Sequence, residues 1–472
     1  MNSPSSTPLP PVIADKKHIH FIGVGGSGMY PLAQILRSRG LNVSGSDNNE
    51  TETLEAVRRA GVNVCPLGQR AENIKGADLI VYTSAVMEDN PELIAARSSG
   101  VQILERAELL GIVTSLYSNT VCVSGTHGKT TVTSMITHIL VEAEKSITAY
   151  IGGKLPSIGG SGISGDSETM ICESCEFRDH FLKLYPDIAV ILNIDADHLD
   201  YFGSIENVRA SFRKFAEKAS KAVIACGDDE NTSTALDGLD KEIITCGKGD
   251  NNIWQPRNIN YISGMQTEFD IYKNGEMFTH AVLNIPGRHN VLNAVFAAAA
   301  ASMCGASPSE IAAGLESFRG AGRRFEKYGV EKGVTVVDDY AHHPAEIAAC
   351  LKAAKELDYK RVWAVFQPFT YSRTELLMQD FADALMIADK RVITSIMGGR
   401  EHNDHDIHTS MLAEITEDAV FFAEEEHDRN FELVTDYVAD NAQSGDLVVT
   451  LGCGDVNKAA RLLLKKLAER NG

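Results

Sequence analysis

Short apolar runs alternate along the chain with amphipathic stretches of helical period. Apolar runs of this length, bounded by Gly, Asn, Asp or Ser, are typical of buried strands in parallel sheets. Helical segments between them indicate repeated strand–helix–strand units, so we predict an α/β fold with helices covering parallel sheets. The predicted strands lie at 18–24, 41–46, 79–84, 120–125, 169–174, 188–194, 221–226, 334–340, 361–366, 390–395 and 446–452.

The pattern restarts about three times, with seams near Ser118 and near Gly320–Gly322. A length of 472 residues also suggests about three domains at roughly 150 residues each. The stretch 247–285 departs from the rhythm, because it alternates and is rich in Gly and Asn, and it predicts an insertion of antiparallel hairpins. We predict a flexible Pro/Ser-rich tail and three domains, at 1–14, 15–117, 118–321 and 322–472.

Charge and composition narrow the class of protein. Lys plus Arg is 44 and Asp plus Glu is 64, giving a net charge of −20, so the mean field repels nucleic acid backbones. No apolar stretch reaches the ~18 residues that span a bilayer, and the N-terminus lacks the pattern of a secretory signal. Nine cysteines are an odd number, which favours free thiols and a cytoplasmic location.

A first glycine-rich loop, Gly23-Val24-Gly25-Gly26-Ser27-Gly28, follows an apolar strand and precedes a helical stretch. Asp47 follows 19 residues after Gly28, at the end of the next predicted strand. This context suits a diphosphate at a helix N-terminus and an acid at a ribose hydroxyl. NAD(P) and a UDP-sugar both present these groups, and a tight turn without a ligand is the third interpretation.

A second loop, Ser124-Gly125-Thr126-His127-Gly128-Lys129-Thr130-Thr131, also joins a strand to a helix. Position 123 is Val, so the first Gly of the general triphosphate motif is absent. The remaining core still predicts a nucleoside triphosphate site, in which Lys129 contacts the β- and γ-phosphates and the Thr130 hydroxyl ligates Mg²⁺. A simple dehydrogenase has no use for such a loop.

Several further motifs, taken with these two loops in order, resemble the Mur ligases over nearly the whole chain. They are RAELL (106–110), NIDADHLDYFG (193–203), GRHNVLNA (287–294), GAGRRFE (320–326), DDYAHHPAEI (338–347) and FQPFTYSRT (366–374), with YTSAV at 82–86. The resemblance is greatest to the branch that joins L-alanine to UDP-N-acetylmuramate. It implies a Rossmann-like UDP-binding domain, a central ATPase domain and a C-terminal Rossmann-like domain that closes over ATP.

The resemblance also implies the chemistry: the lactyl carboxylate attacks the γ-phosphate of ATP, and the alanine amine then displaces phosphate from the acyl phosphate. Clustered cations are needed, since carboxylate and triphosphate repel each other. By family position Lys129, Glu173 and His198 are catalytic, and Thr130, Glu173 and His198 hold Mg²⁺.

Other roles also follow from the resemblance. It assigns ATP to Gly125, Thr126, His127, Gly128, Lys129, Thr130, Thr131, Asn290, Asn293, Arg324 and Asp339, and the UDP-sugar to Gly25, Gly26, Ser27, Gly28, Asp47 and Ser84. Tyr340, His342 and Arg373 are assigned to the amino acid, and a guanidinium such as that of Arg373 matches a carboxylate bidentately. A capping role competes for Asn290, a surface charge for Arg323, and turn packing for His343.

Some features leave alternatives open. Phe369 and Thr370 stand where the family often has His and Arg, so Gly or Ser as acceptor competes with L-alanine. Cys172 and Cys175 lack further ligands at zinc spacing, and the segment His402–His408 suits a solvated loop better than a metal site. Rival functions are a murein peptide ligase that uses a tripeptide, a nucleotide-binding regulator without catalysis, and an NAD(P) oxidoreductase; a monomer and a homodimer remain equally open.

Overall fold

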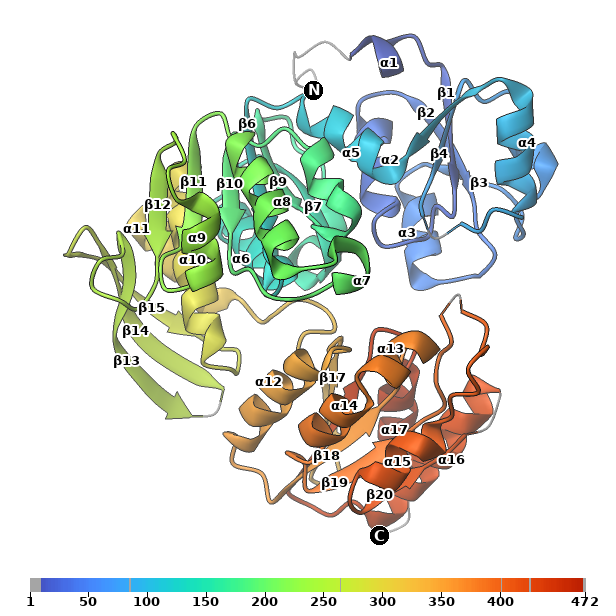
Figure 1. Ribbon diagram of the computed structural model, residues 1–472, viewed down its shortest axis with the longest axis vertical. Helices are drawn as coiled ribbons and strands as arrows, with labels where there is room; N and C mark the ends of the chain where they lie inside the picture. The colour runs from blue at the N-terminus through green and yellow to red at the C-terminus, as the bar shows by residue number, and fades with distance from the viewer. Residues whose placement is uncertain (1–9, 85, 264, 400, 424–425, 470–472) are drawn as a thin grey trace. The chain divides into compact units, whose positions relative to one another are not determined.

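The computed structural model describes residues 10–469, apart from 85, 264, 400 and 424–425 (Figure 1). Three β-sheets carry the fold, with five, ten and six strands. The first two sheets lie in one compact unit, and the third sheet belongs to another. Each sheet is mainly parallel and has helices packed on it, as the α/β pattern predicts.

The first sheet has the strand order β3-β2-β1-β4-β5, and all its pairs are parallel. The order reverses direction between β1 and β4, and such a switch point is where α/β sheets bind ligands. Its strands are β1 (His18–Ile22), β2 (Asn42–Ser46), β3 (Asn63–Val64), β4 (Leu79–Tyr82) and β5 (Gln102–Glu105). Its helices are α2 (Tyr30–Ser38), α3 (Glu52–Arg59), η1 (Ala71–Ile74), α4 (Pro91–Ser99) and α5 (Arg106–Thr114).

The segment before the first sheet differs from the predicted tail. Residues Pro11–Ala14 form a short helix, α1, and Ile13 is fully buried in the core that covers this sheet. Burial of one apolar side chain contributes enough free energy to hold a single turn against the sheet. Residues 1–9 of the predicted tail lie outside the described residues.

The second sheet has the order β15-β14-β13-β12-β11-β10-β6-β9-β7-β8. Strand β6 pairs in parallel with β9 and β10, so the ends of these strands meet at one edge. The strands are β6 (Asn119–Ser124), β7 (Thr148–Leu155), β8 (Gly160–Ile163), β9 (Thr169–Glu173), β10 (Ile188–Ile191), β11 (Ala222–Cys226), β12 (Ile243–Cys246), β13 (Trp254–Ser263), β14 (Gln266–Lys273) and β15 (Glu276–Leu283). The helical elements are α6 (Lys129–Glu142), η2 (Pro156–Ile158), η3 (Phe177–Lys183), α7 (Leu199–Phe202), α8 (Ile205–Glu217), α9 (Glu230–Leu236), α10 (His289–Met303) and α11 (Pro308–Ser317).

The insertion at 247–285 extends this second sheet. Strands β13, β14 and β15 are neighbours in chain order, and the two-residue turn Asn274-Gly275 joins the last two. So short a connection allows only antiparallel pairing. The hairpins predicted from alternation are therefore present, and they lie at the end of the sheet far from β6.

The third sheet has the order β16-β17-β21-β18-β19-β20, in which only the β16–β17 pair is antiparallel. One face carries a core formed with α12, α14 and α15, and the other face packs against α16 and α17. The strands are β16 (Glu326–Glu331), β17 (Val334–Asp339), β18 (Arg361–Phe366), β19 (Lys390–Ile393), β20 (Ala419–Phe421) and β21 (Asp446–Leu451). The helices are α12 (Pro344–Lys355), α13 (Tyr371–Leu376), α14 (Met378–Leu385), α15 (Thr409–Ile415), α16 (His427–Asn441) and α17 (Asn457–Glu469).

Every strand predicted from an apolar run is present within a few residues of its predicted bounds. Most strands that the pattern missed are short, lie at edges or are half-exposed, such as β3, β5, β16 and β20, but β7 is eight residues long and mostly buried and was missed as well. Among the described residues, no helix is long and apolar enough to cross a membrane.

Candidate active site

The second glycine loop lies between β6 and α6, and its backbone requires glycine at two positions. Gly125 has φ +146° and Gly128 has φ +89°, in the region that side chains disfavour. A Cβ at Gly125 would lie 2.9 Å from Leu192 Cβ, and one at Gly128 would lie 3.0 Å from Asn293 Oδ1. Asn293, predicted at the adenine, thus contacts the loop that is predicted to hold the phosphates.

Asn193 fixes the shape of this loop. Its Oδ1 accepts from the His127 amide at 2.8 Å, its Nδ2 donates to the His127 carbonyl at 3.0 Å, and its own carbonyl accepts from the Thr126 amide at 3.1 Å. This residue was missed from the sequence, although it stands at the start of the NIDADHLDYFG motif. The loop amides and the N-terminus of α6 form a cradle of the kind that binds phosphate.

Lys129 folds back over the loop. Its Nζ donates to the carbonyls of Gly125 and Thr126 at 2.6 and 3.1 Å, and it pairs with Glu176 at 2.9 Å. Burial is the largest influence and lowers the pKa of Lys129, but the charge and hydrogen bond of Glu176, together with the charges of Cys175 and Glu173, raise the pKa above its ordinary value. Lys129 is therefore a charged ammonium at the phosphate loop, and Glu176 is a second residue that the sequence did not single out.

Two of the predicted metal ligands lie side by side. Thr130 Oγ1 donates to Glu173 Oε1 at 2.9 Å, and Glu173 Oε2 accepts from the Gly152 amide at 2.8 Å. A Cβ at Gly152 would lie 2.3 Å from Glu173 Oε1, so a side chain there would displace the carboxylate from this position. A hydroxyl and a carboxylate at a phosphate loop are hard oxygen ligands that suit Mg²⁺.

The third predicted ligand, His198, lies in a separate group. His198, Asp197 and Glu176 offer ligand atoms within 4.8 Å of one another, and the Phe177 ring packs on the imidazole with centroids 4.6 Å apart. His198 has φ +53°, a strained conformation that directs the chain into α7. Glu176 joins this group to Lys129, so the residues predicted as catalytic form one continuous set.

The first glycine loop follows β1 and is tied to Asp47. The Gly25 amide donates to Asp47 Oδ2 at 2.9 Å, and a Cβ at Gly25 would lie 2.8 Å from that oxygen. The Ser27 carbonyl accepts from Ser161 Oγ at 3.3 Å. Asp47 thus lies at the loop, at the carboxyl end of β2, as the dinucleotide-type pattern predicts.

A half-buried cation, Arg106, which the sequence did not reveal, also lies at this loop. A Cβ at Gly28 would lie 3.4 Å from Arg106 Nη1 and 2.8 Å from the Tyr150 hydroxyl, and Arg106 hydrogen-bonds that hydroxyl at 2.6 Å. The nearby Tyr150 raises the pKa of Arg106. The predicted sugar-nucleotide residue Ser84 follows β4 and is exposed, and Gly26 forms the turn of the loop with Gly23.

The predicted residues of the third sheet gather at the carboxyl ends of its central strands. Asp339 ends β17, where its two oxygens accept from the amides of Phe325 and Ala341 at 2.7 and 2.8 Å. Arg324 lies over the Tyr340 ring, 5.2 Å from its centroid. The Tyr340 and His342 rings meet edge to face with centroids 5.5 Å apart.

Titration behaviour reflects how deeply this group is buried. Burial raises the pKa of Asp339 to about 6 against the opposing charge of Arg324. Burial lowers the pKa of His342, and Arg373 and Arg324 add to that effect while Glu346 opposes it. Arg373 therefore lies near His342, whose ring meets that of Tyr340, so the three residues predicted for the amino acid are in one neighbourhood.

Arg323 is not the surface charge that the sequence allowed. Its guanidinium pairs with the buried Asp338 at 2.8 Å and donates to the carbonyls of Gly452 and Gly454 at 2.6 and 2.8 Å. It has φ +57°, so the chain turns sharply before β16. Arg323 therefore anchors the segment before β16, and both its guanidinium and that of Arg324 lie over the Tyr340 ring, 5.1 and 5.2 Å from the centroid.

Asn290 and His343 have local partners. Asn290 Nδ2 donates to the Pro286 carbonyl at 2.7 Å, which holds the turn before α10. His343 caps α12 by accepting from the Ala345 amide at 3.4 Å. The ATP contact predicted for Asn290 remains a prediction, and the turn-packing role of His343 agrees with its position.

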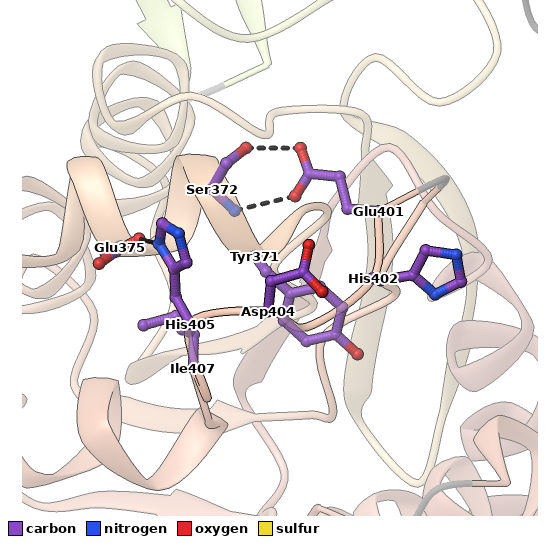
Figure 2. A pocket seen from close by; sticks show the side chains of 8 residues that line it. All are labelled: Tyr371, Ser372, Glu375, Glu401, His402, Asp404, His405 and Ile407. Atoms are coloured by element: carbon purple, nitrogen blue, oxygen red, sulfur yellow. Dashed lines mark hydrogen bonds and ion pairs between the residues drawn. The ribbon is translucent and has the colours of Figure 1, made fainter.

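The histidine-rich segment lies beside α13 and borders a pocket of about 250 Å³ (Figure 2). The residues that line it are Tyr371, Ser372, Glu375, Glu401, His402, Asp404, His405 and Ile407. His405 and His408 pair with Glu375 and Asp406, so their rings are occupied by carboxylates.

Cys172 is buried, and both it and Cys175 are free thiols.

Family models match the chain in three consecutive parts. The Mur ligase family catalytic domain matches residues 18–118, the Mur ligase middle domain matches 123–301, and the Mur ligase glutamate ligase domain matches 323–454. The UDP-N-acetylmuramate–L-alanine ligase of Acetivibrio thermocellus is 43% identical over 456 residues, covering 95% of this chain and 96% of the relative.

Solved structures match over the same length. The UDP-N-acetylmuramate–alanine ligase MurC of Thermotoga maritima has a TM-score of 0.80 and 28% identity, covering 96% of this chain and 99% of that one. A murein peptide ligase of Psychrobacter arcticus shares the fold, with a TM-score of 0.74 and 24% identity over 97% of this chain and all of that one. Sequence and three-sheet architecture agree from end to end, and the chain belongs to the Mur ligase family, whose members are ligases.

Proposed function

We propose that this chain joins L-alanine to the lactyl carboxylate of UDP-N-acetylmuramate at the expense of ATP, in peptidoglycan precursor synthesis. The observation that carries the proposal is the phosphate loop with Lys129 and the Thr130–Glu173 pair, in a chain 43% identical to a ligase of that name. The chain has a net charge of −20, which repels a triphosphate. ATP binding therefore requires a local cluster of cations and backbone amides such as this loop.

The loop amides and Lys129 hold the β- and γ-phosphates, and Lys129 neutralises charge as the sugar carboxylate approaches. Thr130 and Glu173, and at a second position His198, would hold Mg²⁺, which would supply further neutralisation of the phosphate charge. The first glycine loop binds the uridine diphosphate, with Asp47 at the ribose and Arg106 as an additional cation beside Gly28.

Arg373 grips the carboxylate of the amino acid, beside Tyr340 and His342, and leaves its amine free to attack the acyl phosphate. Arg324 and Asp339 supply the third sheet's contacts to ATP, at the γ-phosphate and the ribose. All nine cysteines are free thiols, which supports a reducing cytoplasmic location.

The test is phosphate release from MgATP with one component omitted at a time. Release that requires both UDP-N-acetylmuramate and L-alanine supports the proposal. Separate arms replace alanine by Gly, Ser or the murein tripeptide, and a preference for one of these reassigns the acceptor. ATP binding without release in any arm indicates a regulator instead.

A further inference from the structure

The histidine-rich segment that the proposed chemistry leaves unused packs directly against α13 (Figure 2). Helix α13 carries Arg373 and has only six residues, Tyr371–Leu376. An isolated helix of that length is unstable in water, because nucleation is unfavourable and few backbone bonds repay it. Its conformation, and the direction of Arg373, therefore depend on tertiary contacts.

Glu401 makes two of these contacts at the start of the helix. Its Oε2 accepts from the Ser372 amide at 2.9 Å, and its Oε1 accepts from the Ser372 hydroxyl. The carboxylate satisfies an amide that has no partner within the helix, and its negative charge suits the positive end of the helix. Ser372 directly precedes Arg373 in the chain. Glu401 therefore holds the backbone one residue before the residue that carries the guanidinium.

His405 makes a contact one turn further along. Its Nδ1 lies 2.7 Å from Glu375 Oε2. This pair is exposed, with 70% and 46% of the two side chains accessible, so it contributes little on its own. The Glu401 contacts are also exposed, but Glu401 makes two hydrogen bonds to Ser372, one of them to the backbone, where His405 makes a single side-chain contact.

Described residues on both sides of Glu401 make contacts of their own. Asn403 exchanges two hydrogen bonds with Ile407, at 2.8 and 3.0 Å, and the Ile407 side chain is buried. Gly398 and Gly399, with φ +77° and +61°, bring the backbone close to Tyr371 and Thr370, where a Cβ would lie 3.3 and 3.2 Å from side-chain atoms. These contacts restrict the positions that the Glu401 carboxylate can take beside the short helix.

We propose that Glu401 is a positioning residue that holds α13 so that Arg373 meets the amino-acid carboxylate. The inference rests on the proposed function, because that function assigns the carboxylate to Arg373. Glu401 contacts neither substrate nor reacting atoms in this role. It acts through the Ser372 backbone, and its removal weakens amino-acid binding while ATP binding is preserved.

The test compares wild type with Glu401→Ala and Glu401→Gln. We expect the KM for L-alanine to rise about tenfold in Glu401→Ala, with kcat and the KM for ATP within about twofold of wild type. Glu401→Gln retains an acceptor for the Ser372 amide and should restore part of the affinity. Glu414→Ala, at an exposed position on α15, is the matched control and should leave all three constants unchanged.

Hydrogen exchange supplies a readout that does not depend on substrate. The amides of α13 should exchange faster in Glu401→Ala than in wild type, while those of α12 and α14 remain protected. Unchanged exchange together with an unchanged KM for L-alanine overturns the proposal, as does an equal rise in the KM for ATP. If wild type itself shows no alanine-dependent release, the proposed function fails, and the exchange result still decides whether Glu401 holds the helix.

Discussion

The Thr130 hydroxyl lies 2.9 Å from Glu173 Oε1, which joins the first turn of α6 to the end of β9. These residues are 43 positions apart in the chain, and they meet because β6 and β9 are parallel neighbours whose carboxyl ends coincide. Gly152 on β7 completes the arrangement by donating to the same carboxylate. The proposed metal site is thus built by the register of three strands.

Glu173→Gln should abolish most of the activity. The amide preserves size and can still accept from Thr130, but it removes the negative charge that binds Mg²⁺. We expect phosphate release to fall by about a hundredfold or more and the Mg²⁺ concentration for half-maximal rate to rise, measured by Mg²⁺ titration at fixed ATP. Glu168→Gln, on an exposed residue preceding the same strand, is the control, and wild-type rates in Glu173→Gln would contradict the assignment.

The Lys129–Glu176 ion pair should stabilise the fold, and Lys129 should also be required for activity; two variants can separate these effects. Lys129→Met leaves the Glu176 carboxylate, which is 4% exposed, without its cation. We expect the free energy of unfolding to fall by about 3 kcal/mol, since an uncompensated buried charge is costly. Denaturant titration should show this loss together with the loss of phosphate release.

The double variant Lys129→Met with Glu176→Gln tests the cause. It should regain stability, because no buried charge remains, but it should stay inactive without the lysine. If stability does not return, the loss arises from packing of the lysine stem and not from the ion pair.

The raised pKa of Asp339 predicts that the free energy of unfolding depends on pH. Its folded pKa of about 6 exceeds the unfolded value near 3.8, so the folded state holds a proton more tightly. The contribution of Asp339 is therefore favourable at low pH and is lost as pH rises from about 4 through about 6. A rise in pKa from 3.8 to about 6 corresponds to about 3 kcal/mol in the free energy of unfolding.

The measurement compares wild type with Asp339→Asn by denaturant unfolding at pH 4 and pH 7. The difference in free energy of unfolding, variant minus wild type, should increase by about 3 kcal/mol between the two pH values. A difference independent of pH would show that Asp339 has the same pKa in the folded and unfolded states.

The chain pattern predicts the framework of this fold well, for a physical reason. Central parallel strands are buried on both faces, so β6, β10 and β21 appear as continuous apolar runs. Edge strands such as β3 and β16 are half-exposed and carry polar residues, so no run marks them. The helix at Pro11–Ala14 was missed because one buried Ile13 defines it, and a single apolar position has no period.

The residues of the candidate site likewise fall into those that the sequence predicts and those that it does not. Residues of the glycine loops were predictable because their chemistry follows from local spacing, as with Gly128, Lys129 and Thr130. Asn193, Glu176 and Arg106 were not, since their roles depend on contacts across 66, 47 and 44 positions respectively. Arg323 shows the limit clearly, because the sequence alone cannot distinguish an arginine anchored on a buried carboxylate from its neighbour Arg324, which is equally half-buried.

Arg373 predicts a selective effect on the amino acid. Arg373→Ala removes a bidentate partner, and we expect the KM for L-alanine to rise by about a hundredfold with little change in the KM for ATP. Arg373→Lys should recover only part, because an ammonium is a point charge without the fork geometry. Initial rates at varied alanine and saturating ATP measure both variants, and an equal rise in both KM values would place Arg373 outside the amino-acid site.

The adjacent arginines Arg323 and Arg324 should respond in opposite ways. Arg323→Ala leaves Asp338, whose side chain is fully buried, without its cation, and should lower the free energy of unfolding by about 3 kcal/mol. Arg324→Ala should lose less stability than Arg323→Ala, because Arg324 contacts the Tyr340 ring and acts on Asp339 through its charge, but it should lower phosphate release by about tenfold or more through the γ-phosphate. Thermal melting and phosphate release on both variants separate the roles, since each variant is the other's control for charge and position. Loss of stability in Arg324→Ala, with Arg323→Ala unaffected, would exchange the two assignments.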